Sequence, residues 1–211
     1  MVKTLFVIEH LEPKLSQWLL LEYKHASKIV GKENLMITNA KGLKNVLNKI
    51  AVVFEESIIE LLGTKIKPNR VIVLEPKAEK LLQPEDFIEH TLVIIGGIMG
   101  DHPPKGRTWT LLTSKLLGIA EPRSLGSYQF SIDGAVYMAY QVSKGRRLED
   151  IKVIHDVEIE IPSPYPGIQA TIRLPYAYPV VNGKPLLAPG LMDYLKHNIV
   201  IDEEELLSSK D

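Results

Sequence analysis

The stretch GGIMGDHPPKGRT at residues 96–108 carries the residue types best suited to chemistry. It follows a run of apolar residues directly, so it lies where a buried strand would end. Its glycines let a ligand approach the main chain closely, and Pro103 and Pro104 stiffen the exit. Asp101 and His102 offer a carboxylate beside an imidazole. These features predict one wall of a ligand pocket, although a tight strand-to-helix turn capped by Asp101 explains the glycines equally well.

Two further segments are predicted to end strands in the same way. LEP at 74–76 closes one apolar run with a carboxylate, and RSLGSYQFSIDGA at 123–135 runs from another strand through a loop into a helix. In a doubly wound sheet, the carboxyl ends of parallel strands meet at one crevice, where such folds bind ligands. Glu75 could accept hydrogen bonds from a ribose there, and Leu125 and Ile98 could supply apolar walls. The fingerprints GxGxxG and GxxxxGK[ST] are absent, so the residues alone leave the ligand open.

The candidate acid, base and orienting residues are predicted to share this rim. Glu9 and His10 end the first strand, and Glu12 follows before Pro13, where it is equally suited to start a helix. Arg107, just after the prolines, could orient a substrate or Asp101. The candidate catalytic set is therefore Asp101, Glu9, His10, Glu12, His102 and Arg107. No histidine spacing typical of a metal site is present, so we expect no metal.

Alternating apolar patterns predict an α/β core. Strands are expected at 4–10, 35–38, 70–76 and 91–97, the last two central because they are almost uniformly apolar. Helices are expected from Glu12-Pro13 to Gly31, over 107–117 and over 132–143, while the segment IAVVF at 50–54 could be a short strand between two helices.

The composition changes after residue 145. IKVIHDVEIEIP and QATIRLPYAYPVV alternate like strands, SPYPG is a turn, and Asn182-Gly183 is a hairpin signal. Prolines keep this part out of a central sheet because each removes a ladder donor. We therefore predict a core over 1–145 and a β-rich appendage over 146–211, which packs on the core's flank and closes with two short helices.

The composition of all 211 residues limits the function classes. Lys and Arg number 25 against 26 acidic residues, so no overall field attracts nucleic acid or membrane. There are no cysteines, which removes thiol chemistry, and the first apolar run is too short for a signal peptide or a membrane span. The sequence predicts residence in the cytoplasm and no membrane partner.

Five segments together resemble the archaeal and eukaryotic SPOUT-fold methyltransferase family, whose fungal member is a protein arginine methyltransferase acting on a small-subunit ribosomal protein. They are VIEHLEPKLSQWLLLEY (7–23), LEP with LQPEDF (82–87), GGIMGDHPPKGRT, RSLG with the Gln129 loop, and KPLLAPGLMDYL (184–195). The resemblance covers nearly the whole chain and is weakest over 39–69. The most specific part is GG-x-x-GDHPP-x-x-RT.

The resemblance implies that S-adenosylmethionine (SAM) binds in a deep trefoil knot, with 132–143 as the knotted helix. The cofactor residues it implies are Leu74, Glu75, Pro76, Gly96, Gly97, Ile98, Gly100, Asp101, Leu125, Gly126, Gln129 and Ser131. The expected reaction is methylation of an arginine in a ribosomal protein. Methylation of ribosomal or transfer RNA and a non-catalytic SAM-binding or ribosome-assembly module are the alternatives. A homodimer is expected from other SPOUT enzymes, unless the appendage covers that surface.

Overall fold

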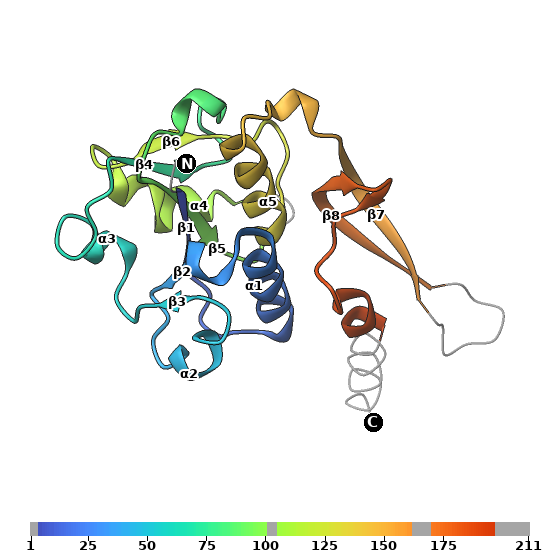
Figure 1. The fold of residues 1–211 in the computed structure, drawn as a ribbon. Coiled ribbons are helices and arrows are strands. Elements are labelled where there is room, and N and C mark those ends of the chain that lie inside the picture. Colours follow the sequence, from blue (N-terminus) through green and yellow to red (C-terminus); the bar gives the residue numbers. More distant parts are fainter. Residues whose placement is uncertain (1–3, 101–104, 162–169, 197–211) are drawn as a thin grey trace.

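The protein is described here from a computed structural model, which covers residues 4–100, 105–161 and 170–196. Its main part is a six-stranded parallel sheet in the order β3-β2-β1-β5-β4-β6 (Figure 1). The strands are β1 (Thr4–His10), β2 (Leu35–Thr38), β3 (Val52–Val53), β4 (Arg70–Leu74), β5 (Thr91–Gly97) and β6 (Glu121–Arg123). The α/β class, the SPOUT-like parallel sheet and the central position of β5 are confirmed.

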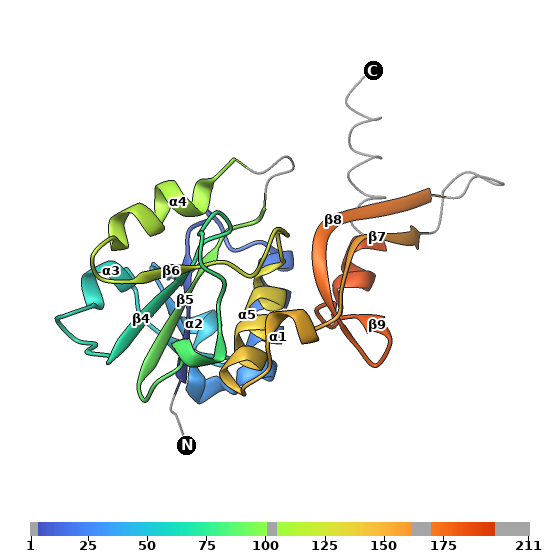
Figure 2. The same cartoon turned by 90° about the horizontal axis from the view of Figure 1, so that it is seen from above.

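Helices cover both faces of this sheet, which explains the apolar strands. One face packs against α1 (Gln17–Val30), α2 (Lys44–Leu47) and α5 (Ile132–Ser143). The other packs against α3 (Ile58–Leu61), α4 (Arg107–Leu111) and the short helix η3 (Thr113–Leu116). Figure 2 shows α1 and α5 side by side, with α4 on the opposite side of the strands. The remaining short helices are η1 (Lys32–Asn34), η2 (Pro84–Asp86) and η4 (Leu148–Asp150).

Two predicted helix boundaries are wrong for local reasons. α1 begins at Gln17 and not at Glu12-Pro13, because the Ser16 side chain accepts a hydrogen bond from the Leu19 N–H and caps the helix. The predicted helix over 107–117 is broken at Leu112, whose backbone leaves the helical region (φ −132°, ψ −66°). The break starts η3, which carries the buried Thr113 toward Glu75.

The chain at Arg123–Ser124 lies between the two arms of the loop that follows β4. The Arg123 carbonyl accepts from the Glu75 N–H at 2.9 Å, where the loop begins. The Ser124 N–H donates to the Lys80 carbonyl, and the Ser124 carbonyl accepts from the Leu82 N–H, both at 2.9 Å, where the loop ends. The segment at Arg123–Ser124 is thus bonded to both ends of this loop. The trefoil knot itself stays a prediction.

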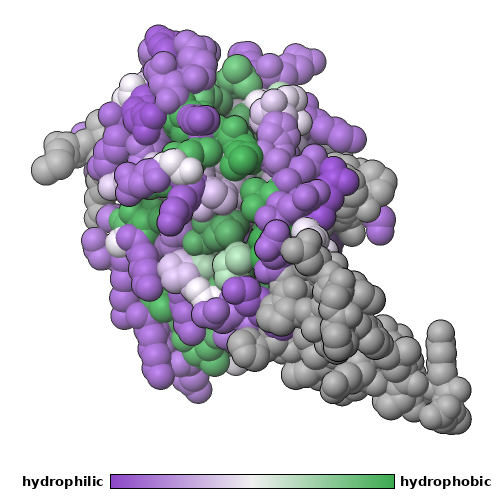
Figure 3. Space-filling model, turned by 90° about the vertical axis from the view of Figure 1, so that its right-hand side faces the viewer, coloured by the Kyte–Doolittle hydropathy of each residue, from purple (hydrophilic) through white to green (hydrophobic). Residues whose placement is uncertain are grey.

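A separate antiparallel sheet follows the core, as the prolines predicted. It consists of β7 (Val153–Ile161), β8 (Ala170–Val181) and β9 (Lys184–Pro185), with the predicted Asn182-Gly183 turn in the left-handed conformation (φ 51° and 77°). Its apolar side shares a cluster with Trp18 and Leu21 of α1. The second sheet therefore packs on the flank of the core, and Figure 3 turns this side toward the viewer, with hydrophobic side chains among hydrophilic ones.

The last predicted elements are described only in part. Residues 191–196 are helical, in agreement with the first closing helix. The expected SPYPG turn and the second closing helix lie outside the described residues. No helix in the described ranges is long and apolar enough to cross a membrane.

Candidate functional site

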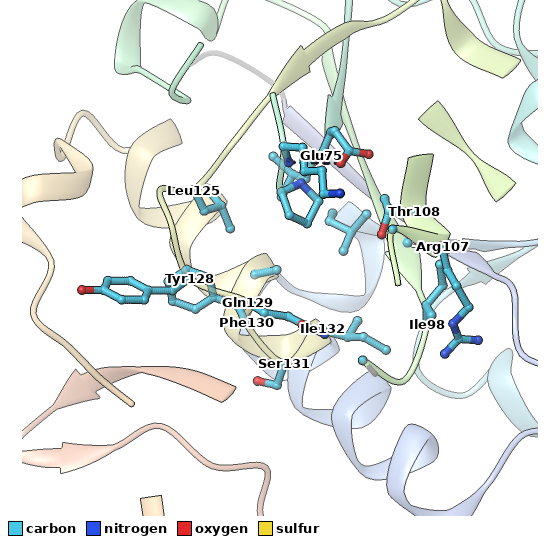
Figure 4. A pocket seen from close by; sticks show the side chains of 18 of the residues that line it. Glu75, Ile98, Arg107, Thr108, Leu125, Tyr128, Gln129, Phe130, Ser131 and Ile132 are labelled. Atoms are coloured by element: carbon cyan, nitrogen blue, oxygen red, sulfur yellow. Dashed lines mark hydrogen bonds between the residues drawn. The ribbon is translucent and has the colours of Figure 1, made fainter. Parts of the chain in front are cut away.

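A pocket of about 310 Å³ lies at the carboxyl ends of β4, β5 and β6, where the three predicted loops meet. Its volume is in the range typical of small-molecule sites. Figure 4 shows Leu125, Tyr128 and Gln129 on one side of it, Ile98, Arg107 and Thr108 on the other, and Glu75 between them. The described residues that line it are Leu74–Lys77, Ile95, Gly96, Ile98, Gly100, Lys105–Thr108, Leu125, Ser127–Ile132 and Ala135.

Most of the residues predicted to bind the cofactor line this pocket. They are Leu74, Glu75, Pro76, Gly96, Ile98, Gly100, Leu125, Gln129 and Ser131. Gly97 and Gly126 are not part of the lining. Asp101 and His102 lie outside the described residues, so their proposed roles stay predictions.

Gly97 has a packing role in place of the expected ligand contact. It pairs with His10 in the sheet, and a Cβ atom there would overlap the Tyr23 hydroxyl and lie 2.8 Å from the Glu9 carbonyl oxygen. Only glycine lets β1, β5 and α1 approach this closely.

Glu75 is buried, and both of its carboxylate oxygens are already used. One accepts a hydrogen bond from the Thr113 hydroxyl at 2.9 Å, and the other accepts from the Lys77 N–H at 3.1 Å. The carboxylate therefore ties the loop after β4 to η3. Its expected contact with a ribose stays a prediction.

Glu9 and His10 do not lie on the pocket rim, which corrects their expected position. Glu9 is 1% exposed and accepts hydrogen bonds from the Thr38 hydroxyl, the Ser57 hydroxyl and the Ile58 N–H at 2.5–3.0 Å, so it anchors the start of α3. His10 points to the opposite face of the sheet, where its Nδ1 lies 2.9 Å from the Tyr23 hydroxyl. Burial lowers the pKa of His10, against a smaller effect of Glu12. Both side chains therefore hold core elements together.

Glu12 connects the loop after β1 to the pocket wall, which corrects its assignment as a helix start. One carboxylate oxygen accepts from the Met99 N–H at 2.8 Å and from Arg107 at 3.0 Å. Arg107, which lines the pocket, also donates to the Met99 carbonyl. Glu12 and Arg107 together fix the main chain between Ile98 and Gly100.

The pocket combines an apolar interior with cations at its edge. Apolar side chains come from all three loops, and the lining also includes the cations Lys77, Lys105 and Arg107. Such a site suits a ligand with a flat apolar part and an anionic group. Among the described residues, no three histidine or carboxylate side chains gather to hold a metal ion.

A buried polar cluster lies between α1 and the start of α5, and no pattern in the sequence predicted it. Glu22 accepts hydrogen bonds from the Trp18 indole at 2.6 Å and from the Ile132 N–H at 3.0 Å. Beside it, His25 Nδ1 lies 2.6 Å from the Asp133 carboxylate. Burial, and secondarily the charge of Asp133, raise the pKa of Glu22 to about 8. The cluster holds the N-terminus of α5, and with it the pocket residues Ser131 and Ile132.

The raised pKa of Glu22 predicts a stability that falls as pH rises. Between the ordinary value of 4.5 and about 8, the folded state keeps a proton that the unfolded state has released. The free energy of unfolding therefore decreases with pH in this window, by at most about 1.4 kcal/mol per pH unit for one proton. Urea unfolding at several pH values should show this decrease, and Glu22→Gln should remove it. Parallel pH profiles of the two proteins would contradict the assignment.

Comparison with known proteins places these observations in one family. The family model described as "Protein arginine N-methyltransferase SFM1-like" matches residues 5–201. The chain is 32% identical to protein arginine N-methyltransferase SFM1 of Saccharomyces cerevisiae, over 96% of this chain and 99% of the yeast protein. The crystal structure of yeast SFM1 complexed with SAM superimposes with a TM-score of 0.80 at 30% identity, over 94% of this chain and 92% of that one.

A more distant structure shares the fold alone. Trm10 of Thermococcus kodakaraensis superimposes with a TM-score of 0.57 at 17% identity, over 70% of this chain and 96% of that one. The matches to SFM1, by contrast, extend over the core and the second sheet. The chain therefore belongs to the SFM1-like family of protein arginine N-methyltransferases.

Proposed function

We propose that this protein is a SAM-dependent methyltransferase that transfers a methyl group to an arginine side chain of a protein. The observation that carries the proposal is the convergence of three strand-end loops on one pocket, in a chain whose yeast relative is an arginine methyltransferase with structures complexed with SAM and S-adenosylhomocysteine.

The pocket residues fit the chemistry of this donor. Leu125, Ile98 and Ile132 offer apolar walls for the adenosine, and the backbone of the loop over 125–129 offers hydrogen-bonding groups for the adenine edge. Lys77, Lys105 or Arg107 can hold the carboxylate of the amino-acid part.

The reaction needs positioning more than covalent chemistry. When bound, SAM supplies an electrophilic methyl group on a positively charged sulfur. A guanidinium nitrogen that has given up a proton forms the new N–C bond while the C–S bond breaks, which leaves a neutral thioether. Transfer requires the two reactants to meet in line with about 3 Å between the reacting atoms, and such positioning supplies much of the rate. The acceptor of the proton stays unassigned, since the predicted candidates Asp101 and His102 lie outside the described residues.

A protein acceptor is favoured over RNA by the charges of the described surface, and a ribosomal protein is the acceptor that we propose. RNA methylation would need a strip of cations, and the sequence offers two candidates: Lys41, Lys44 and Lys49, or Lys144, Arg146 and Arg147. Several of these have acidic or aromatic neighbours. Arg147 pairs with Glu85, Lys144 lies over the Tyr140 ring, and Lys41 and Lys44 share a depression with Glu55, Glu56 and Glu60. A phosphate backbone binds best where cations follow one another without acids.

Mass spectrometry tests the substrate class directly. Purified protein is incubated with SAM and with small ribosomal subunits or their separated protein and RNA fractions. We expect a mass increase of about 14 Da per methyl group on arginine in one ribosomal protein. Methylated nucleosides without methylarginine would support the RNA alternative, and binding of SAM without any transfer would support the non-catalytic one.

Removal of the Glu12 carboxylate should loosen the pocket wall. Glu12→Ala leaves the Met99 N–H and Arg107 without their shared acceptor, and we expect the dissociation constant for S-adenosylhomocysteine to rise about 5- to 10-fold. Glu12→Gln keeps a carbonyl oxygen in the same place and should retain most of the affinity. Calorimetry measures both, and equal affinities of the alanine variant and the wild type would contradict this role.

Residence in the cytoplasm follows as a further proposal, because ribosomal proteins are synthesised and used there. The homodimer stays a prediction. The second sheet already packs against α1, next to the predicted knotted helix α5.

A further inference from the structure

The middle strand of the second sheet, β8, contains a bulge that points one tyrosine toward the pocket. In the pairing of β7 with β8, His155 lies opposite Ala177 and Val157 opposite Leu174. Two residues of β8, Pro175 and Tyr176, therefore face the single residue Asp156. Pro175 has no N–H to donate to a ladder, and a bulge at such a place redirects the side chain that follows.

Tyr176 and its neighbour form hydrogen bonds to two of the three pocket loops. The Tyr176 hydroxyl donates to the Gly100 carbonyl at 2.7 Å. The next residue, Ala177, donates its N–H to the Gln129 carbonyl at 2.8 Å. Gly100 follows β5 and Gln129 follows β6, and both line the pocket. One strand of the second sheet thus fixes the distance between the two loops.

Gly100, Gln129 and Tyr176 pack against one another without free space between them. A Cβ atom on Gly100 would overlap the Gln129 amide and lie 2.7 Å from a ring carbon of Tyr176. The glycine therefore lets the Gly100 backbone contact both side chains at once. A shift of Tyr176 would displace Gly100 and Gln129 as well, because no free space separates the three groups.

We infer that Tyr176 is a positioning residue for the methyl-donor pocket, and that the second sheet completes this pocket within a single chain. The inference rests on the proposed function, since it needs the pocket to bind the methyl donor. The sheet does not depend on this hydroxyl for its attachment. Tyr178, Leu174 and Leu191 pack in one cluster with Trp18 and Leu21 of α1.

A pair of tyrosine variants in the full-length protein separates positioning from general stability. Tyr176→Phe removes only the hydroxyl that donates to Gly100. Tyr178→Phe removes a hydroxyl two residues away on the same strand, buried and without a hydrogen-bond partner among the described residues. Calorimetry with S-adenosylhomocysteine gives the affinity, and thermal unfolding without ligand controls for the fold.

We expect Tyr176→Phe to raise the dissociation constant for S-adenosylhomocysteine by about 3- to 10-fold, with an unfolding midpoint close to that of the wild type. Tyr178→Phe should change the dissociation constant by less than about twofold, because no hydrogen bond is lost. In methyl transfer, Tyr176→Phe should raise KM for the donor and leave KM for the protein acceptor unchanged.

Three results would overturn the inference. If Tyr176→Phe binds the ligand like the wild type, the hydroxyl does not position the pocket. If both variants lose affinity equally, the effect belongs to the sheet in general. If the wild type itself fails to bind S-adenosylhomocysteine, the proposed function falls and this inference falls with it.

Discussion

Gly100→Ala is expected to weaken the binding of S-adenosylhomocysteine between about 5-fold and 100-fold. The added methyl group would overlap the Gln129 amide and press on the Tyr176 ring, so two side chains at the pocket must move. Overpacking of this kind costs about 1–3 kcal/mol, which corresponds to that range of affinity. Calorimetry of wild type and variant measures the change.

Gly96→Ala is the matched comparison, because it adds the same group four residues earlier on the same pocket wall. Its Cβ would meet Ile98 at 3.4 Å and Thr108 at 3.7 Å, which are ordinary contacts. We expect a smaller loss of affinity for Gly96→Ala, below about threefold, and an unfolding midpoint close to that of the wild type. Overpacking strains the folded protein, so the midpoint of Gly100→Ala should fall together with its affinity. Equal affinities of Gly100→Ala and the wild type would contradict the close approach of the three groups.

Asp86→Ala is expected to destabilise the fold by about 2–4 kcal/mol. The Asp86 carboxylate accepts hydrogen bonds from Arg123 Nε and Nη2 at 2.8–3.0 Å, and both side chains are largely buried. Loss of the carboxylate leaves a buried guanidinium with Glu121 as its remaining acidic partner, and breaking such a pair is costly. The pair joins η2, which follows the loop after β4, to β6. Urea unfolding measures the effect.

Glu85→Ala is the control for this prediction. Glu85 is the neighbouring acid, and its ion pair with Arg147 is more than half exposed on both sides. Exposed pairs of this kind contribute little, so we expect a change below about 1 kcal/mol. If Asp86→Ala and Glu85→Ala unfold at the same urea concentration, the buried pair does not hold the loop.

The sequence predicted those elements best whose structure depends on a single local property, such as burial or a backbone preference. β4 and β5 are buried on both faces, so their uniform apolar runs identified them, and Asn182-Gly183 specified its turn. The boundaries of α1 and α4 were predicted wrongly. Ser16, and not Glu12-Pro13, caps the start of α1. The helix break at Leu112 accompanies a hydrogen bond from Thr113 to Glu75, which is distant in the sequence.

The site was predictable as a region but not atom by atom. Parallel strands bring their carboxyl ends together, and the described parts of the predicted loops at 74–76, 96–102 and 123–131 do contribute residues to one pocket. Glu9 and His10 were misplaced because successive side chains of a strand point to opposite faces, here into the two helix layers. Tyr176 could not be found at all, since its contact with Gly100 joins residues 76 positions apart through a bulge.

The central claim is that the pocket at the ends of β4, β5 and β6 binds the methyl donor. NMR with SAM carrying a ¹³C-labelled methyl group tests it most directly, through nuclear Overhauser contacts between donor protons and methyl groups of the protein. We predict contacts to Ile98, Leu125 and Ile132, which line the pocket. Contacts to Val53 beside Lys41 and Lys44, with none to these three residues, would place the donor in the other depression and contradict the account.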